Sequence, residues 1–187
     1  MTEALNADGL IVGKTDTIFT FTGRTIRPLD PDPQDIVIED IAHALANQCR
    51  FTGHTKSFYS VAEHCILASQ CVPFEFRLEA LLHDASEAYL SDIARPVKKA
   101  PGFSETYLHY EAQLERAIGK RFGIPGSMSD AVRAADEAML KSEIQFLMPP
   151  SFADISDVPP EGTPVPVCMT PKQSEMTFLA YYEAYRP

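Results

Sequence analysis

The amino-acid sequence predicts an all-α fold, and three observations lead to this expectation. Apolar residues recur at helical spacing through most of the 187-residue chain. Alternation of the kind found in strands is confined to residues 17–22, and seven prolines are gathered between residues 149 and 171. We expect a single domain over residues 1–187: a helical bundle with its core at about 24–147, a short β-like N-terminal piece, a proline-rich arm at 149–171 and a closing helix at 174–185.

The N-terminal region predicts little regular structure. Residues 1–15 are expected to form a loose lead-in, and residues 17–22, Thr-Ile-Phe-Thr-Phe-Thr, a short strand or hairpin arm. Three prolines in residues 27–33 predict a turn-rich loop, since proline cannot join a helix interior. Asp35 is expected to cap the helix that follows.

Six helices are predicted after this loop. Helical spacing places them at residues 38–48, 59–71, 74–90, 103–122, 130–148 and 174–185. Residues 49–54 are expected to form a loop between the first two helices. Pro73 ends the second helix, Pro96 ends a short piece after the third, and Ser127 or Ser129 caps the fifth.

Composition restricts the class of protein. Hydrophobic residues make up 45% of the chain and charged residues 22%, as in soluble globular proteins. A net charge of −10 argues against a surface for DNA or RNA polymers, although a metal ion and local Lys or Arg side chains can still bind a small anion. The four cysteines form no CxxC pair, and the sequence has neither a signal-peptide core nor an apolar run of ~18 residues. We therefore expect a cytoplasmic protein with reduced thiols and no membrane partner.

The chemically most informative segment is residues 81–92, Leu-Leu-His-Asp-Ala-Ser-Glu-Ala-Tyr-Leu-Ser-Asp. His83, Asp84 and Glu87 fall within two turns of a largely apolar helical pattern, with Glu87 one turn beyond His83 on the same face. Burying such groups without partners is costly, and a divalent metal ion would remove that cost. The alternative is a helix whose His-Asp pair lies at its solvent edge.

Two residues outside this segment favour the metal interpretation. His64 and Asp136 each lie in an amphipathic helical pattern, and Asp136 stands among alanines. Together with His83 and Asp84 they would supply two imidazoles and two carboxylates from three helices. Such a set leaves positions open for water and a substrate oxygen, which is typical of a catalytic metal site. It suits Zn, Mn, Fe, Co, Ni or Mg, so the identity of the divalent metal ion stays open.

At these residues the sequence resembles the HD-domain phosphohydrolases, metal-dependent enzymes with an all-helical core. The H…HD…D pattern of that family falls on His64, His83-Asp84 and Asp136. The resemblance runs from about residue 24 to residue 147 and implies that these four residues are the metal ligands.

The branch that the chain resembles acts on nucleotides: the bacterial 5′-deoxynucleotidases and the phage dATP triphosphohydrolases. In that branch the HD pair opens an H-D-x-x-E…D…P-x-K run, which continues here through Glu87, Asp92 and Lys98. An Arg-Trp pair about fourteen residues before the first histidine contacts the nucleotide there, and the matching pair here is Arg50-Phe51. The chain has no tryptophan, and phenylalanine can stack on a base with less area and no indole N–H.

The resemblance also implies a role for each of these residues. Glu87 would orient the attacking water or accept its proton, and Arg50 and Lys98 would hold phosphate oxygens. Phe51 would stack on the base. Asp92 would accept a hydrogen bond from the sugar hydroxyl; its alternative role is to cap the next short helix.

The resulting hypothesis is a metal-dependent phosphohydrolase that cleaves a nucleotide phosphoester, most directly that of a 5′-deoxynucleoside monophosphate. One alternative is a dNTP triphosphohydrolase that releases tripolyphosphate. An alternative of another class is a non-catalytic regulator that binds a nucleotide or a metal on the same fold. A homodimer or a higher homo-oligomer is expected from the resemblance and from the frequency of two-fold assemblies.

Overall fold

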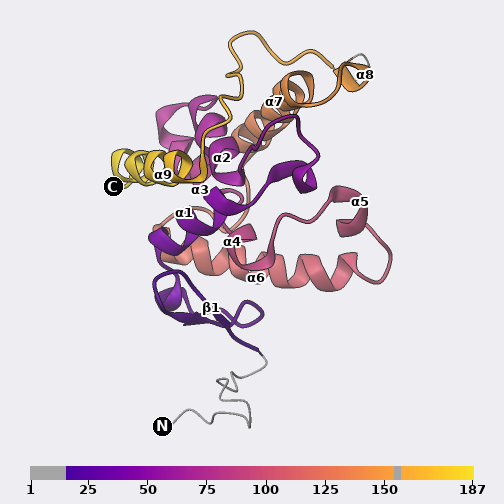
Figure 1. Cartoon of the computed structure of the whole chain (residues 1–187). Helices are drawn as coiled ribbons and strands as arrows, with labels where there is room; N and C mark the ends of the chain where they lie inside the picture. The colour runs from indigo at the N-terminus through magenta and orange to yellow at the C-terminus, as the bar shows by residue number, and fades with distance from the viewer. Residues whose placement is uncertain (1–15, 154–156) are drawn as a thin grey trace, which may run out of the picture.

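The computed structural model describes residues 16–153 and 157–187, and it confirms the all-α prediction. The predicted lead-in, residues 1–15, lies outside the described residues. Figure 1 shows the helices gathered into one body, with the small hairpin of β1 (Ile18–Phe19) and β2 (Thr25–Ile26) beside α1 (Ile38–Asn47). Among the described helices, none is both long and apolar enough to cross a membrane. The helices are α1 (Ile38–Asn47), α2 (Val61–Gln70), α3 (Arg77–Leu82), α4 (Glu87–Leu90), α5 (Arg95–Lys98), α6 (Ser104–Phe122), α7 (Asp130–Leu147), α8 (Pro150–Ala153) and α9 (Pro171–Tyr185).

The strand predicted at residues 17–22 is present but shorter. β1 (Ile18–Phe19) pairs antiparallel with β2 (Thr25–Ile26), because the chain already turns at residue 20. The hairpin is attached to α1: the backbone N–H and the hydroxyl of Thr22 donate to the two carboxylate oxygens of Asp40, at 2.7 and 2.9 Å. Asp40 is almost fully buried, so these two bonds also satisfy a carboxylate that would otherwise be costly to bury.

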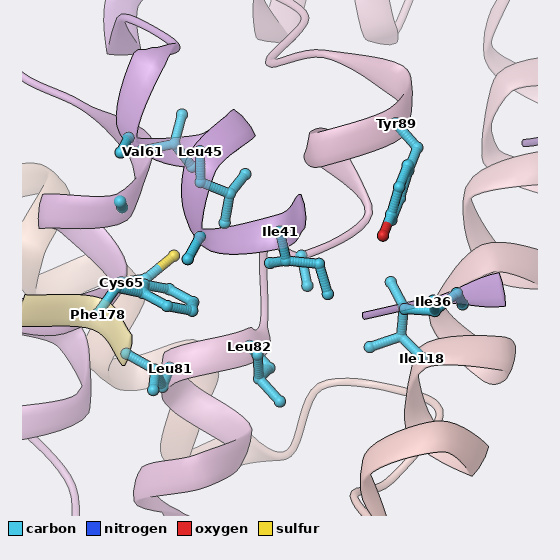
Figure 2. Close-up of a cluster of buried hydrophobic side chains, with 14 of the residues drawn as sticks. Ile36, Ile41, Leu45, Val61, Cys65, Leu81, Leu82, Tyr89, Ile118 and Phe178 are labelled. Atoms are coloured by element: carbon cyan, nitrogen blue, oxygen red, sulfur yellow. The ribbon is translucent and has the colours of Figure 1, made fainter. Parts of the chain in front are cut away.

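The main hydrophobic core lies between α1, α2, α3 and α9. Figure 2 shows Phe178 of α9 beside Cys65 of α2 and Leu81 of α3, while Ile118 of α6 reaches the side of the core near Tyr89. Fully burying a side chain of this size contributes roughly 1.5–3 kcal/mol. This core fixes the helices whose other faces carry the polar residues described below.

Helix α2 is the central helix of the molecule. Every residue from Val61 to Ser69 is buried, including Glu63 and His64. The Ser60 side chain caps the helix by accepting a hydrogen bond from the Glu63 N–H at 3.1 Å. A charged group and an imidazole inside such a helix need partners, and both have them.

The third predicted helix, residues 74–90, is not continuous. It consists of the 3-10 turn Phe74–Phe76, then α3, then a turn, then α4. In that turn the Glu87 N–H donates to the Asp84 carbonyl at 2.9 Å, a three-residue spacing that is tighter than an α-helix. His83 and Asp84 therefore lie in a helical turn between α3 and α4, rather than on one long helix.

Two predicted helix boundaries also differ from the structure, and one of the two predicted caps of α7 is confirmed. Asp35 does not cap α1; it belongs to the 3-10 turn Pro33–Asp35, and α1 begins without a side-chain cap. Pro96 begins α5 instead of ending a segment, in keeping with the fixed φ of proline in a first helical turn. Ser129, and not Ser127, caps α7.

The predicted proline-rich arm contains the short helix α8 and then, from residue 157 to residue 170, chain without helix or strand. Figure 1 shows it running from α8 over the molecule to α9. The arm is tied to α2, because the Glu63 carboxylate accepts hydrogen bonds from three successive backbone N–H groups at 2.7–2.8 Å. These belong to Val167, Cys168 and Met169.

Candidate metal centre

Four side chains from three parts of the fold meet beside α2. His64 comes from α2, His83 and Asp84 from the turn after α3, and Asp136 from α7. His64 Nε2 lies 3.2 Å from His83 Nε2, 3.2 Å from Asp136 Oδ1 and 3.7 Å from Asp84 Oδ2. His83 Nε2 lies 3.3 Å from Asp84 Oδ2 and 3.9 Å from Asp136 Oδ1. The structure therefore brings together all four predicted ligands, and the group of His64, His83 and Asp84 could hold a metal ion.

The hydrogen bonds on the far sides of the two imidazoles fit a metal ion. His83 Nδ1 donates to the Ala80 carbonyl at 2.7 Å, because a carbonyl can only accept. His64 Nδ1 lies 2.6 Å from Glu143 Oε1, the carboxylate partner that metal-binding histidines commonly have. With Nδ1 protonated, each neutral ring turns the lone pair of Nε2 toward the other ring and toward two carboxylates. Electron-rich groups at such distances could hold a cation between them, as in the group of His64, His83 and Asp84.

The charges of the metal-free site lead to the same conclusion. Burial and Arg50 lower the pKa of His64, but the neighbouring Glu143 and Asp136 outweigh them and raise this pKa to about 9. Burial alone would raise the pKa of Asp136 and of Asp84, yet the histidines beside them hold both below their usual range. A proton on His64 thus supplies the positive charge that these carboxylates require, and a divalent ion would replace it.

Glu143 is a residue that the sequence analysis missed. It is fully buried on α7 and accepts from His64, from the Tyr59 hydroxyl at 2.9 Å and from Arg50 Nε at 3.3 Å. Glu143 stands seven residues after Asp136, two helical turns along the same face. That spacing was a signal, but a glutamate is far more common on a helix surface than in a core.

A cavity of about 700 Å³ opens from this cluster. Its volume is within the range of small-molecule binding sites. Eight of the nine predicted site residues line it, and His64 lies just behind its wall; the eight are Arg50, Phe51, His83, Asp84, Glu87, Asp92, Lys98 and Asp136.

The Arg50 end of the cavity is a strained turn. Phe51 and Thr52 have φ of 54° and 53°, the left-handed region that residues other than glycine rarely adopt. Arg50 Nη1 donates to Asp84 Oδ2 at 3.3 Å, and its guanidinium lies 5.8 Å from the centre of the Phe51 ring. The turn therefore places the predicted Arg-Phe pair at the cavity wall with the arginine already paired to a candidate metal ligand.

Glu87 is buried at the edge of the cavity. Its Oε2 has no hydrogen-bond partner in the described part of the chain, and its Oε1 lies 3.9 Å from Lys98 Nζ. Burial, helped by the carboxylates of Asp84 and Asp92, holds the pKa of Glu87 well above its usual range. Such a carboxyl takes up a proton readily.

Lys98 and Asp92 line the cavity near Glu87. Lys98 Nζ donates to Glu111 Oε1 at 2.7 Å, so its position is set from α6. Burial raises the pKa of Asp92, whose backbone N–H donates to the Gln48 side chain at 3.2 Å. Asp92 does not cap α5, because the N-cap of that helix is Ala94 and has no side-chain hydrogen bond. The capping alternative for Asp92 is therefore wrong.

Comparison with known proteins gives relatives but no activity. No family model matches the chain. The uncharacterized protein RCAP_rcc00048 of Rhodobacter capsulatus is 38% identical over 159 residues, which cover 78% of the chain and 79% of the relative. The uncharacterized protein YfdR of Escherichia coli is 45% identical over 126 residues, which cover 67% of the chain and 69% of the relative. At this identity over more than two thirds of each relative, the chain belongs to the family of YfdR and RCAP_rcc00048.

Proposed function

We propose that the chain is a metal-dependent phosphohydrolase of the HD-domain type, which cleaves the phosphoester of a 5′-(deoxy)nucleoside monophosphate. One observation carries the proposal. Two imidazole Nε2 atoms and two aspartate carboxylates from α2, the α3–α4 turn and α7 converge at the base of a 700 Å³ cavity. The cavity wall carries both a carboxyl with a raised pKa and the cations that phosphate requires.

The residues of the chain divide the chemistry between them. A bound divalent ion supplies an activated water and neutralises phosphate charge. Glu87 orients the attacking water and takes its proton, for which its unpartnered Oε2 is available. Attack of this water on phosphorus breaks the bond to the 5′ oxygen of the sugar, and that oxygen takes up a proton, so that orthophosphate and a nucleoside leave.

The other residues of the cavity wall bind the substrate. Arg50 and Lys98 hold phosphate oxygens, and Phe51 stacks on the base. Asp92 accepts a hydrogen bond from the sugar hydroxyl. Arg50 and Lys98 are already paired with carboxylates, which keeps both side chains in place before the nucleotide arrives.

A triphosphate is the second candidate substrate, and two cations favour it. Arg95 and Lys99 also line the cavity, and neither has a carboxylate within 4.0 Å among the residues that the structure describes. Two further cations on the cavity wall suit additional phosphate groups. In that case the product is tripolyphosphate rather than orthophosphate.

The test is a product screen on metal-stripped protein. Mn²⁺, Co²⁺, Mg²⁺ and Zn²⁺ are added in turn, each against ribo- and deoxynucleoside mono- and triphosphates. We expect orthophosphate from a monophosphate, lost in His83→Ala and kept in His109→Ala, an exposed histidine outside the cavity. Tripolyphosphate from a dNTP selects the second candidate. Nucleotide binding without any product contradicts both and supports a non-catalytic regulator.

A further inference from the structure

Gln48 links the two acidic residues of the cavity wall through their backbones. Its side-chain Nε2 donates to the Glu87 carbonyl at 3.0 Å, and its Oε1 accepts from the Asp92 N–H at 3.2 Å. One side-chain amide thus bonds two backbone groups, the Glu87 carbonyl and the Asp92 N–H, which are five residues apart. Gln48 itself does not line the cavity.

The segment between these two points is strained. Ser91 ends α4 with φ 67° and ψ 154°, a region that is essentially reserved for glycine. Its N–H donates to the Glu87 carbonyl at 2.8 Å, so that this carbonyl accepts hydrogen bonds from both Ser91 and Gln48. A strained residue persists only where its surroundings hold it, and the Gln48 amide holds the chain on both sides of Ser91.

Gln48 also connects this segment to the helix that carries His64. It follows α1 directly, and its backbone carbonyl accepts from the Val61 N–H, the first residue of α2, at 3.1 Å. Gln48 therefore ties the loop that carries Asp92 to α2, the helix that supplies His64 to the candidate metal centre.

We propose that Gln48 is a positioning residue, which fixes Asp92 relative to Glu87 and thereby sets the selectivity of the cavity for the sugar of the nucleotide. This inference rests on the proposed function. It assigns to Gln48 no contact with substrate or metal. Its loss should act on discrimination between deoxyribo- and ribonucleotides and leave the affinity for metal unchanged.

The test compares Gln48→Met with Asn47→Ala. Methionine has nearly the length of glutamine but neither bonds the Glu87 carbonyl nor accepts from Asp92. Asn47 is the exposed neighbour, and within the described part of the chain its side chain bonds only the His43 carbonyl of α1. In Gln48→Met we expect amide hydrogen exchange in residues 87–94 to rise about tenfold, the effect of about one lost hydrogen bond, with α2 and α7 unchanged. Asn47→Ala should match the parent chain.

The kinetic arm measures kcat/KM for matched deoxyribo- and ribonucleotides with Mn²⁺. We expect the ratio of the two to fall about tenfold in Gln48→Met, mostly through KM, while the Kd for Mn²⁺ stays within twofold. Gln48→Glu adds a rescue. The protonated acid both donates and accepts as the amide does, so its ratio, relative to the parent at the same pH, should recover from pH 8 to pH 5.5.

The two proposals fail separately. A parent chain without turnover overturns the proposed function, and hydrogen exchange then still decides whether Gln48 holds residues 87–94. Unchanged exchange in Gln48→Met overturns the positioning role. Equal loss of metal affinity and of protection in α2 would also overturn it, because Gln48 would then be a general structural residue.

Discussion

Glu143 is the residue that joins the candidate metal centre to Arg50 of the cavity wall. Its Oε1 lies 2.6 Å from His64 Nδ1 and also accepts from Tyr59, and its Oε2 accepts from Arg50. Burial would raise its pKa, but Arg50 and His64 hold the pKa of Glu143 below its usual range. An ionised Glu143 keeps the proton of His64 on Nδ1, and Nε2 is left free for a metal.

Replacing this carboxylate with an amide should weaken metal binding. In Glu143→Gln one oxygen becomes an NH₂ group that must face a donor, whether on His64, Tyr59 or Arg50. We expect the affinity for Mn²⁺ to fall about 10- to 100-fold, as for other partners of metal-binding histidines. Titration of metal-stripped protein measures it. Glu137→Gln, at an exposed position of the same helix, should bind as the parent does. Equal affinity in both variants would contradict this role for Glu143.

Glu115 predicts how stability depends on pH. Burial, with repulsion from Glu111, raises the pKa of Glu115 from 4.5 to about 7. The folded chain therefore binds this proton more tightly than the unfolded chain. The contribution of Glu115 to stability is full below about pH 4.5 and is lost as the pH rises through 7.

A glutamine at this position should remove that pH dependence. We expect Glu115→Gln to be more stable than the parent chain at pH 8 and to lose this advantage by pH 5. Urea unfolding of metal-free protein at the two pH values gives the difference. Glu115 is partly exposed, so solvent screening keeps the effect small. If the difference in stability between Glu115→Gln and the parent chain did not change with pH, the pKa of Glu115 would not be raised in the folded chain.

At the scale of elements, the arm is held to α2 by one carboxylate. The Val167, Cys168 and Met169 N–H groups all point at Glu63, and Cys168 takes a φ of 63° to allow it. Consecutive N–H groups arranged in this way form a concave anion site. The arm thus fastens to the residue that directly precedes His64, and α2 gains a partner for its buried charge.

Glu63→Gln should loosen this attachment. The amide keeps one acceptor oxygen but sets its NH₂ group against at least one backbone donor. We expect a loss of about 2 kcal/mol in the free energy of unfolding, the usual cost of leaving a buried donor unpaired. Urea unfolding measures the loss, with the exposed Glu75→Gln as the control. A loss of less than about 0.5 kcal/mol in the free energy of unfolding, the range of surface substitutions, would show that the Glu63 carboxylate does not stabilise the arm.

The sequence predicted the bounds of helices with a regular apolar face to within one residue at each end. The helices expected at residues 103–122 and 130–148 are α6 (Ser104–Phe122) and α7 (Asp130–Leu147). The helix expected at residues 74–90 failed because periodicity cannot distinguish an α-helix from the tighter three-residue bonding around His83. The four predicted ligands nevertheless lie together, since a local tightening of the turn moves side chains little relative to their neighbours in sequence.

The parts of the site that the sequence did not predict depend on contacts between distant segments. Gln48 meets Asp92, and Glu143 meets His64 and Arg50, only after α1, α2, α4 and α7 have packed. The side chains of Gln and Glu are at home on helix surfaces, so nothing in their local sequence marks them as buried partners. The four predicted metal ligands differ because histidine and aspartate within apolar helical patterns already conflict with their surroundings.

At the scale of the whole molecule, the candidate metal centre joins segments that are far apart in the chain. His64, the His83-Asp84 pair and Asp136 come from α2, the α3–α4 turn and α7. The chain carries a net charge of −10, and in the centre two carboxylates sit beside buried imidazoles. An ion bound there would cross-link three packed elements and would also reduce the repulsion between the two carboxylates.

Metal binding should therefore raise the thermal stability of the whole chain. At a free metal concentration of 100 Kd, binding to the folded state adds about 2.7 kcal/mol, which is roughly 5–10 °C in Tm for a chain of this size. We expect this shift with Mn²⁺ or Zn²⁺ in metal-stripped protein and in His109→Ala, and its loss in His83→Ala. An equal shift in His83→Ala would place the ion elsewhere. Because the readout needs no substrate, it separates the metal centre from the reaction: a shift without turnover leaves the centre standing and favours a regulator, whereas turnover without a shift would detach hydrolysis from these four residues.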